Sequence, residues 1–89
     1  MQRINIEWDE ESIEHIWRHR VEPEEVEELL RGRYIFRRGR DNTYYVFGRS
    51  GSGRYLFVVL SLISRAYYRV VTARDMTTSE RQLARRKAK

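Results

Sequence analysis

The hydrophobic period of this chain changes at Gly32, and this change constrains the fold more than any other feature. Before Gly32, apolar residues recur at intervals of three and four, which is the spacing of one helix face. After it, they alternate or run together in short segments rich in aromatic and β-branched residues, as strands do. A chain of 89 residues supports one modest core. We therefore expect a single α+β domain over residues 1–89.

A short strand and a first helix are predicted at the N-terminus. Alternating apolar and polar side chains over residues 4–8 predict the strand. Asp9 is suited to cap the helix, which we expect to end near His19. Apolar residues at positions i, i+3 and i+4 form the stripe expected to face the core, namely Ile13, Ile16 and Trp17.

A second helix is predicted from Pro23. Proline suits the first helical position, and the acidic residues around it complement the positive end of the helix dipole. Val26, Leu29 and Leu30 form its apolar stripe. Gly32 predicts a left-handed residue at the end of the helix.

Four strands, separated by turn-forming residues, are predicted at 34–38, 43–49, 54–63 and 66–73. We expect an antiparallel sheet of four to five strands, with the segment RYLFVVLSLI in its middle because both its faces are apolar. The capping-box spacing of Thr77 and Glu80 opens a C-terminal helix, which packs on the sheet with the two N-terminal helices. Residues 85–89 are expected to form a frayed basic tail.

Charge is segregated along the chain. Residues 1–30 hold ten acids and three bases, whereas residues 31–89 hold fifteen bases and three acids. Sixteen of the eighteen bases are arginine, whose planar fork binds phosphate oxygens in pairs. Genomic composition or thermal adaptation is an alternative origin of the arginine excess. The segregation favours a face that attracts polyanions, with nucleic acid as the first candidate.

Several classes of protein are excluded by composition. The chain has no cysteine, which rules out cysteine nucleophiles, cysteine zinc sites and disulfide scaffolds. No apolar run approaches the length of a membrane span, and the N-terminus lacks a signal pattern. We expect a cytoplasmic protein with no membrane partner.

Strand alternation indicates where a site can form. In the second predicted strand, one face carries Tyr45, Phe47 and Arg49. In the fourth, with Arg69 on the opposite face, one face carries Tyr68, Val70, Thr72 and Arg74. If Arg49 and Arg74 point to the same side, their guanidinium groups converge at one edge of the sheet. Arg18 and His19, at the end of the first helix, complete the candidate site. The alternatives are solvated arginines paired with helix acids, and a His19 that only interacts with the helix dipole.

Four segments, IEWDEE, RHRVEPEEVEELL, YVFGRSGSGRYLFVVL and YRVVTARDMTTSER, resemble in order and spacing the BrnT family of toxins from bacterial type II toxin–antitoxin modules. The resemblance implies a RelE-like fold, ribonuclease activity that inhibits translation, a cognate antitoxin as partner, and operator DNA binding only through the antitoxin complex. By position, Arg18 and His19 correspond to the lysine and histidine of the family's KHG-like element. Arg49 corresponds to the arginine of its GR motif, and Arg74 to that of its S-A-R motif. Thr77, Glu80 and Arg81 correspond to its T…ER ending.

The chain departs from the family pattern at three places. Arg20 stands where glycine is usual, Gln82 stands where a tyrosine often follows ER, and the stretch from Leu30 to Tyr44 is shorter than in the family. The first departure removes a residue that adopts left-handed backbone at little cost. The third bears on the shape of a substrate groove.

The sequence hypothesis is an endoribonuclease that acts without metal or other cofactor. Arginines clamp the phosphate, and His19 is the best proton acceptor or donor. The catalytic candidates are Arg18, His19, Arg49 and Arg74. The RNA-binding candidates are Arg37, Arg38, Arg40, Arg54, Arg69, Arg85 and Arg86. Tyrosines of the strands are candidates for stacking on bases.

Three alternatives remain open. One is a non-catalytic module that binds nucleic acid or an antitoxin through the same basic face. Another is a protein adaptor that never contacts nucleic acid. The third is a divalent metal site on one face of the first helix, built from Glu11, His15 and His19.

Overall fold

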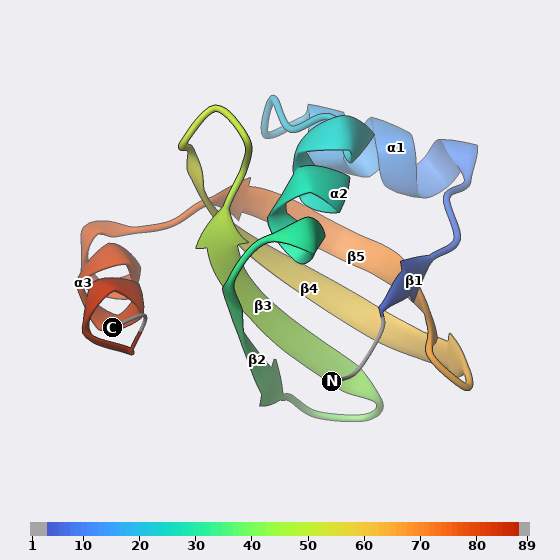
Figure 1. Cartoon of the computed structure of the whole chain (residues 1–89). Helices are drawn as coiled ribbons and strands as arrows, with labels where there is room; N and C mark the ends of the chain where they lie inside the picture. Colours follow the sequence, from blue (N-terminus) through green and yellow to red (C-terminus); the bar gives the residue numbers. More distant parts are fainter. Residues whose placement is uncertain (1–3, 88–89) are drawn as a thin grey trace.

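Three helices and a five-stranded sheet make up the fold, seen in a computed structural model that describes residues 4–87 (Figure 1). The strands are β1 (Asn5–Ile6), β2 (Tyr34–Arg38), β3 (Thr43–Arg49), β4 (Tyr55–Ser64) and β5 (Tyr67–Asp75). The helices are α1 (Glu10–Trp17), α2 (Pro23–Arg31) and α3 (Thr78–Lys87). The predicted α+β class is confirmed.

The strand order across the sheet is β1-β5-β4-β3-β2. The predicted meander of β2 to β5 is confirmed, and β4 lies in the middle of the sheet. The purely antiparallel sheet is wrong, because β1 pairs with β5 in parallel and the sheet is therefore mixed. Tight turns impose antiparallel pairing on neighbouring strands, whereas β1 and β5 are joined through the whole domain.

Helix starts follow the predicted caps. The Asp9 carboxylate accepts a hydrogen bond from the Ser12 backbone N–H at 2.7 Å, and α2 begins at Pro23. The Thr77 hydroxyl and the Glu80 carboxylate cap the start of α3. The left-handed end predicted at Gly32 is wrong, because Gly32 has φ −99° and leads in extended conformation directly toward β2.

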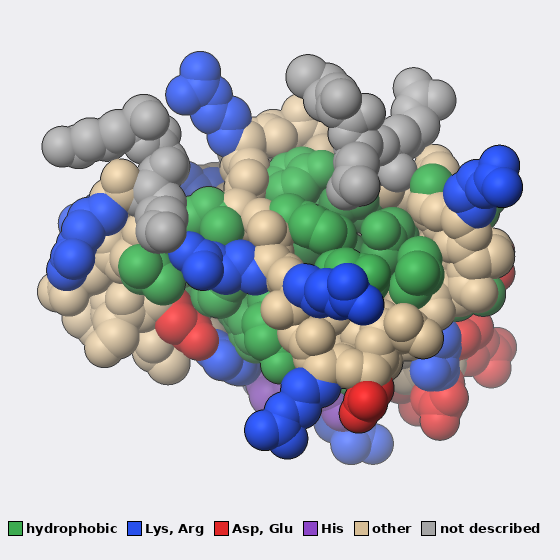
Figure 2. Space-filling model, turned by 90° about the horizontal axis from the view of Figure 1, so that it is seen from below, with side chains coloured by type: hydrophobic (Ala, Val, Ile, Leu, Met, Phe, Trp, Pro, Cys, Tyr) green, Lys and Arg blue, Asp and Glu red, His purple; other side chains and the backbone are tan. Residues whose placement is uncertain are grey.

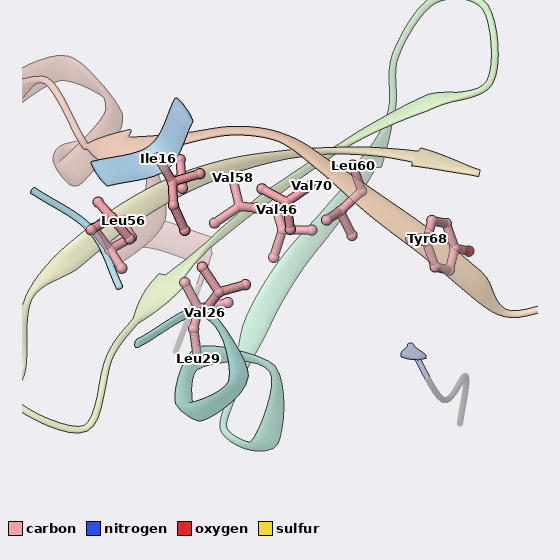
Figure 3. Close-up of a cluster of buried hydrophobic side chains, with 11 residues drawn as sticks. Ile16, Val26, Leu29, Val46, Leu56, Val58, Leu60, Tyr68 and Val70 are labelled. Atoms are coloured by element: carbon pink, nitrogen blue, oxygen red, sulfur yellow. The ribbon is translucent and has the colours of Figure 1, made fainter. Parts of the chain in front are cut away.

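Helices α1 and α2 cover one face of the sheet and build the core with it (Figure 3). The largest fully buried side chains are Ile16, Val21, Val26, Leu29, Val46, Leu56, Val58, Leu60 and Val70. The stripe predicted for α1 is wrong in part, since Ile16 is buried but Ile13 and Trp17 are 38% and 55% exposed. This helix of eight residues packs mainly on β5, so only a narrow part of it meets the sheet.

A register shift in β5 decides which side chains face away from the helices. Leu60 pairs with Val70, but Val59 pairs with Thr72, so Val71 is an extra residue in the strand. Such a bulge turns all later side chains to the opposite face. The predicted common face of Val70, Thr72 and Arg74 is therefore wrong, and Arg74 lies opposite Phe57 on the other face of the sheet. We call this face, away from α1 and α2, the open face.

Helix α3 lies apart from α1 and α2, beside the sheet (Figure 1). It continues to Lys87, as far as the described part of the chain reaches, and residues 88–89 of the expected frayed tail lie outside that part. No helix over residues 4–87 combines the length and apolarity required to cross a membrane.

Candidate nucleic-acid interface

Aromatic rings line the open face along β3 and β4. Phe47 pairs with Phe57 across the two strands, and their ring centroids are 4.9 Å apart. The ring centroid of Tyr45 lies 5.6 Å from that of Phe57, on the same face. Figure 2 shows hydrophobic side chains in the middle of this face, with Lys and Arg side chains around them. An apolar surface ringed by cations suits a polyanion that carries flat rings.

Three arginines surround one further ring on this face, that of Tyr55. The guanidinium carbons of Arg49 and Arg81 each lie 4.7 Å from the ring centroid, and that of Arg85 lies 5.8 Å away. Arg49 is placed by β3, because it is the register partner of Tyr55. Arg81 and Arg85 are placed by α3, because residues four apart share one helix face. We call these four residues the Tyr55 cluster.

The Tyr55 cluster gathers positive charge that no carboxylate in the described part of the chain balances. The ion pairs found within residues 4–87 link no acid to Arg49, Arg81 or Arg85. The recorded hydrogen bond of the Arg49 side chain goes to the carbonyl of Gly53, at 3.3 Å. A hydrogen bond from Arg85, and the charges of all three arginines, lower the pKa of Tyr55. Like charges this close are costly, and a bound anion offsets that cost.

Arg74 lies next to the cluster but has its own counter-ion. Its guanidinium carbon lies 4.5 Å from the centroid of the Phe57 ring, two residues along β4 from Tyr55. Both terminal nitrogens of Arg74 donate to the Glu80 carboxylate, at 2.9 and 3.0 Å. This bidentate bond lowers the pKa of Glu80. A phosphate that reaches Arg74 competes with Glu80.

The structure brings together two of the four predicted catalytic residues. Arg49 and Arg74 both extend over rings of β4 on the open face. Arg18 and His19 instead follow α1, in the layer that covers the other face. The His19 ring lies 6.2 Å from that of His15, and both Arg18 and His19 are exposed. The prediction that His19 joins the arginine clamp has no support in this geometry.

Arg54 was a predicted RNA-binding residue, but its guanidinium is fully engaged by the fold. It donates to both oxygens of Asp75, at 2.6 and 3.2 Å, and to Glu25 at 3.2 Å. It also donates to the carbonyls of Arg20 and His19, at 2.6 and 3.1 Å. The bond to Arg54 lowers the pKa of Asp75. Arg54 therefore ties the α1–α2 connection to the end of β5.

Arg69, another predicted RNA-binding residue, is also paired. It bonds Asp9 at 2.8 Å and Glu11 at 2.6 Å, and the bond to Arg69 is the main cause that lowers the pKa of Asp9 to about 2. Since Glu11 binds Arg69, it is not directed at His15. Within residues 4–87 no group of three potential metal ligands comes together.

The other RNA-binding candidates are exposed. Arg37 and Arg38 end β2, Arg40 lies in the following turn, and Arg86 lies on α3 beside Arg85. Sequence reasoning named Tyr55 only among several tyrosines that could stack on bases, and Arg81 only as a match to the T…ER ending. Two signals pointed to them: Arg81 and Arg85 are four residues apart on a predicted helix, and a short SGSG turn sets Tyr55 opposite Arg49.

Comparison with protein-family models, curated proteins and solved structures found no match for this chain.

Proposed function

We propose that the open face binds RNA and that the protein is a metal-independent endoribonuclease toxin that inhibits translation. The observation that carries the proposal is the Tyr55 cluster, in which three arginines that pair with no acid of residues 4–87 surround one ring beside an aromatic surface. Arginine and aromatic side chains together suit single-stranded RNA, because they bind phosphates and stack on unpaired bases. The resemblance to BrnT toxins supports the same function, with a RelE-like variant of the α+β fold and a cognate antitoxin as partner.

The proposed reaction is attack of a ribose 2′-hydroxyl on the adjacent phosphate. It requires a proton acceptor, cations that stabilise the charged transition state, and a proton donor for the leaving 5′-oxygen. The arginines of the Tyr55 cluster supply the cations. Tyr55 is better placed than His19 to transfer a proton, because three arginines surround its ring and a hydrogen bond from Arg85 is the main cause that lowers its pKa.

Cleavage and binding measured together test this proposal. With a chelator present, Arg49→Gln is expected to slow RNA cleavage about 100-fold, as loss of one charge-stabilising donor does. Tyr55→Phe is expected to slow it at least about 100-fold through loss of proton transfer, while binding stays nearly unchanged. Arg65→Gln, an exposed arginine in the β4–β5 turn, is the control and should cleave like the parent protein. Equal cleavage by all three variants would refute the assignment.

A second candidate function is RNA binding without cleavage. It is favoured by the position of His19, which leaves the clamp without an imidazole. In this case the parent protein binds RNA with a steep dependence on salt but leaves the strand intact. Induced expression in a bacterial host separates the two, since the toxin arrests growth with loss of intact RNA and the binding module does not.

A further inference from the structure

The arginines with recorded side-chain contacts fall into two groups. Arg54, Arg69 and Arg74 are each held by carboxylates, which also fix their positions. The arginines of the Tyr55 cluster form no ion pair with any acid of residues 4–87. Glu80, in the first turn of the helix that carries Arg81 and Arg85, is already bound by Arg74 and by the Thr77 backbone N–H. The cluster therefore presents uncompensated charge to a ligand.

The amount of charge indicates the kind of phosphate that fits. Three guanidinium groups meet at one ring, while an internal phosphate of RNA carries a single negative charge. A phosphate monoester carries nearly two negative charges at neutral pH, because its second pKa is about 6. It also offers three free oxygens, compared with two on an internal phosphate. A dianion therefore offsets the repulsion within the cluster better than an internal phosphate does.

The directions of approach fit the same ligand. Arg49 reaches the Tyr55 ring from β3, while Arg81 and Arg85 reach it from α3. Arginine forks arriving from two elements can each bond a pair of phosphate oxygens. The free oxygens of a terminal phosphate are accessible from several sides. An internal phosphate is instead flanked by a sugar on each of two sides.

We propose that the Tyr55 cluster is a binding site for the terminal phosphate monoester of an RNA strand. The inference rests on the proposed function in naming RNA as the source of this phosphate. A free nucleotide monophosphate has the same chemistry, so the experiment includes it as a separate ligand. A terminal phosphate and the scissile internal phosphate of the proposed reaction would occupy this cluster in turn, so a bound strand end competes with cleavage.

The test uses one short single-stranded RNA in three forms, with hydroxyl ends, with a 5′-phosphate, or with a 3′-phosphate. Adenosine monophosphate is the fourth ligand. At about pH 7.5, one phosphorylated end is expected to tighten binding about tenfold over the hydroxyl form, as added charged hydrogen bonds do. Arg85→Gln should abolish this preference. Arg65→Gln, at the opposite end of β4, should keep it.

A pH change tests whether the dianion is what the site recognises. At about pH 5 the terminal phosphate is mostly a monoanion, so the preference should disappear. The arginines that face the site, Arg49 from β3 and Arg81 and Arg85 from α3, stay charged in this interval, and Tyr55 is the other titratable group at the site. Of the neighbouring pair, Arg74 also stays charged, and the pKa of Glu80 is lowered below its ordinary 4.5.

The outcomes separate this inference from the proposed function. If all three RNA forms bind equally at both pH values, the terminal-phosphate site is refuted while RNA binding stands. If no RNA binds but adenosine monophosphate does, and Arg85→Gln abolishes that binding, the dianion site stands and RNA as its source is refuted. If none of the four ligands binds, both proposals fail.

Discussion

At the scale of single residues, Arg54 is the clearest case of a charge that serves the fold rather than a ligand. Its side chain is 26% exposed and bonds two carboxylates and two carbonyls from different elements. Arg54→Gln leaves Asp75 and Glu25 without this partner. We expect the free energy of unfolding to fall by about 2 kcal/mol, measured by urea denaturation. Arg65→Gln should change it by less than about 0.5 kcal/mol, and an equal loss in both variants would contradict the role of Arg54.

Arg20 is a second residue with a measurable effect. It has φ +59°, in the left-handed region that glycine adopts at little cost and other residues do not. Its carbonyl accepts a bond from Arg54, which helps to hold the chain in this conformation. Arg20→Gly is expected to raise the free energy of unfolding by about 0.5 kcal/mol, because relief of strain exceeds the entropy cost of glycine. A lower melting temperature in this variant would contradict that balance.

At the scale of elements, the sequence predicts what is local and misses what depends on pairing. The bounds of β2 and β3 match the prediction, because alternation and turn residues define them directly. The bulge at Val71 was not predicted, since it exists only in the register between β4 and β5. Without this bulge, Arg74 would lie opposite Leu56, on the face of the sheet that α1 and α2 cover. Arg49 and Arg74 lie over neighbouring rings of the open face, but the alternation assigned to β5 was wrong.

Helix α3 is the element through which two arginines reach the Tyr55 ring. Replacing both, in Arg81→Gln/Arg85→Gln, should weaken RNA binding and keep the fold, since both side chains are exposed. Because both arginines bind the same phosphate, the slope of log affinity against log salt should become shallower by about 0.7, the value of one phosphate contact on single strands. The matched control is Arg31→Gln/Arg65→Gln, which removes the same charge from exposed positions elsewhere. Equal slope changes in both variants would indicate a non-specific effect of net charge.

At the scale of the whole molecule, opposite charges from different segments of the chain hold the fold together. Asp9, Asp75 and Glu80 each bond an arginine, and each has a lowered pKa. Because the folded chain binds protons less readily here than the unfolded chain, this pairing stabilises the fold at neutral pH. The stabilisation should be lost as the pH falls from about 4.5 toward about 2.

Thermal denaturation across this pH range measures the effect. Asp9→Asn keeps a capping oxygen but removes the charge that pairs with Arg69, so the melting temperature should fall less steeply with acid than in the parent protein. Glu14→Gln, exposed on the same helix, should follow the parent curve. Identical slopes for all three proteins would show that the Asp9–Arg69 pair does not contribute to acid sensitivity.

The candidate site shows the same limit of sequence reasoning at this scale. Charge segregation and strand alternation indicated a basic, aromatic surface, and the open face has that character. The separation of Arg18 and His19 from Arg49 could not be predicted, because it depends on which face of the sheet α1 covers. Residue types alone also did not distinguish paired arginines such as Arg54 and Arg69 from those of the Tyr55 cluster.

The location of RNA on the protein tests the central claim most directly. Arginine-selective isotope-labelled NMR observes the Nε–H group of each guanidinium while a short single-stranded RNA is added. We predict that the signals of Arg49, Arg81 and Arg85 shift first and most, while those of Arg54 and Arg69 stay fixed. Shifts centred on Arg18, with the Tyr55 cluster unchanged, would contradict the account.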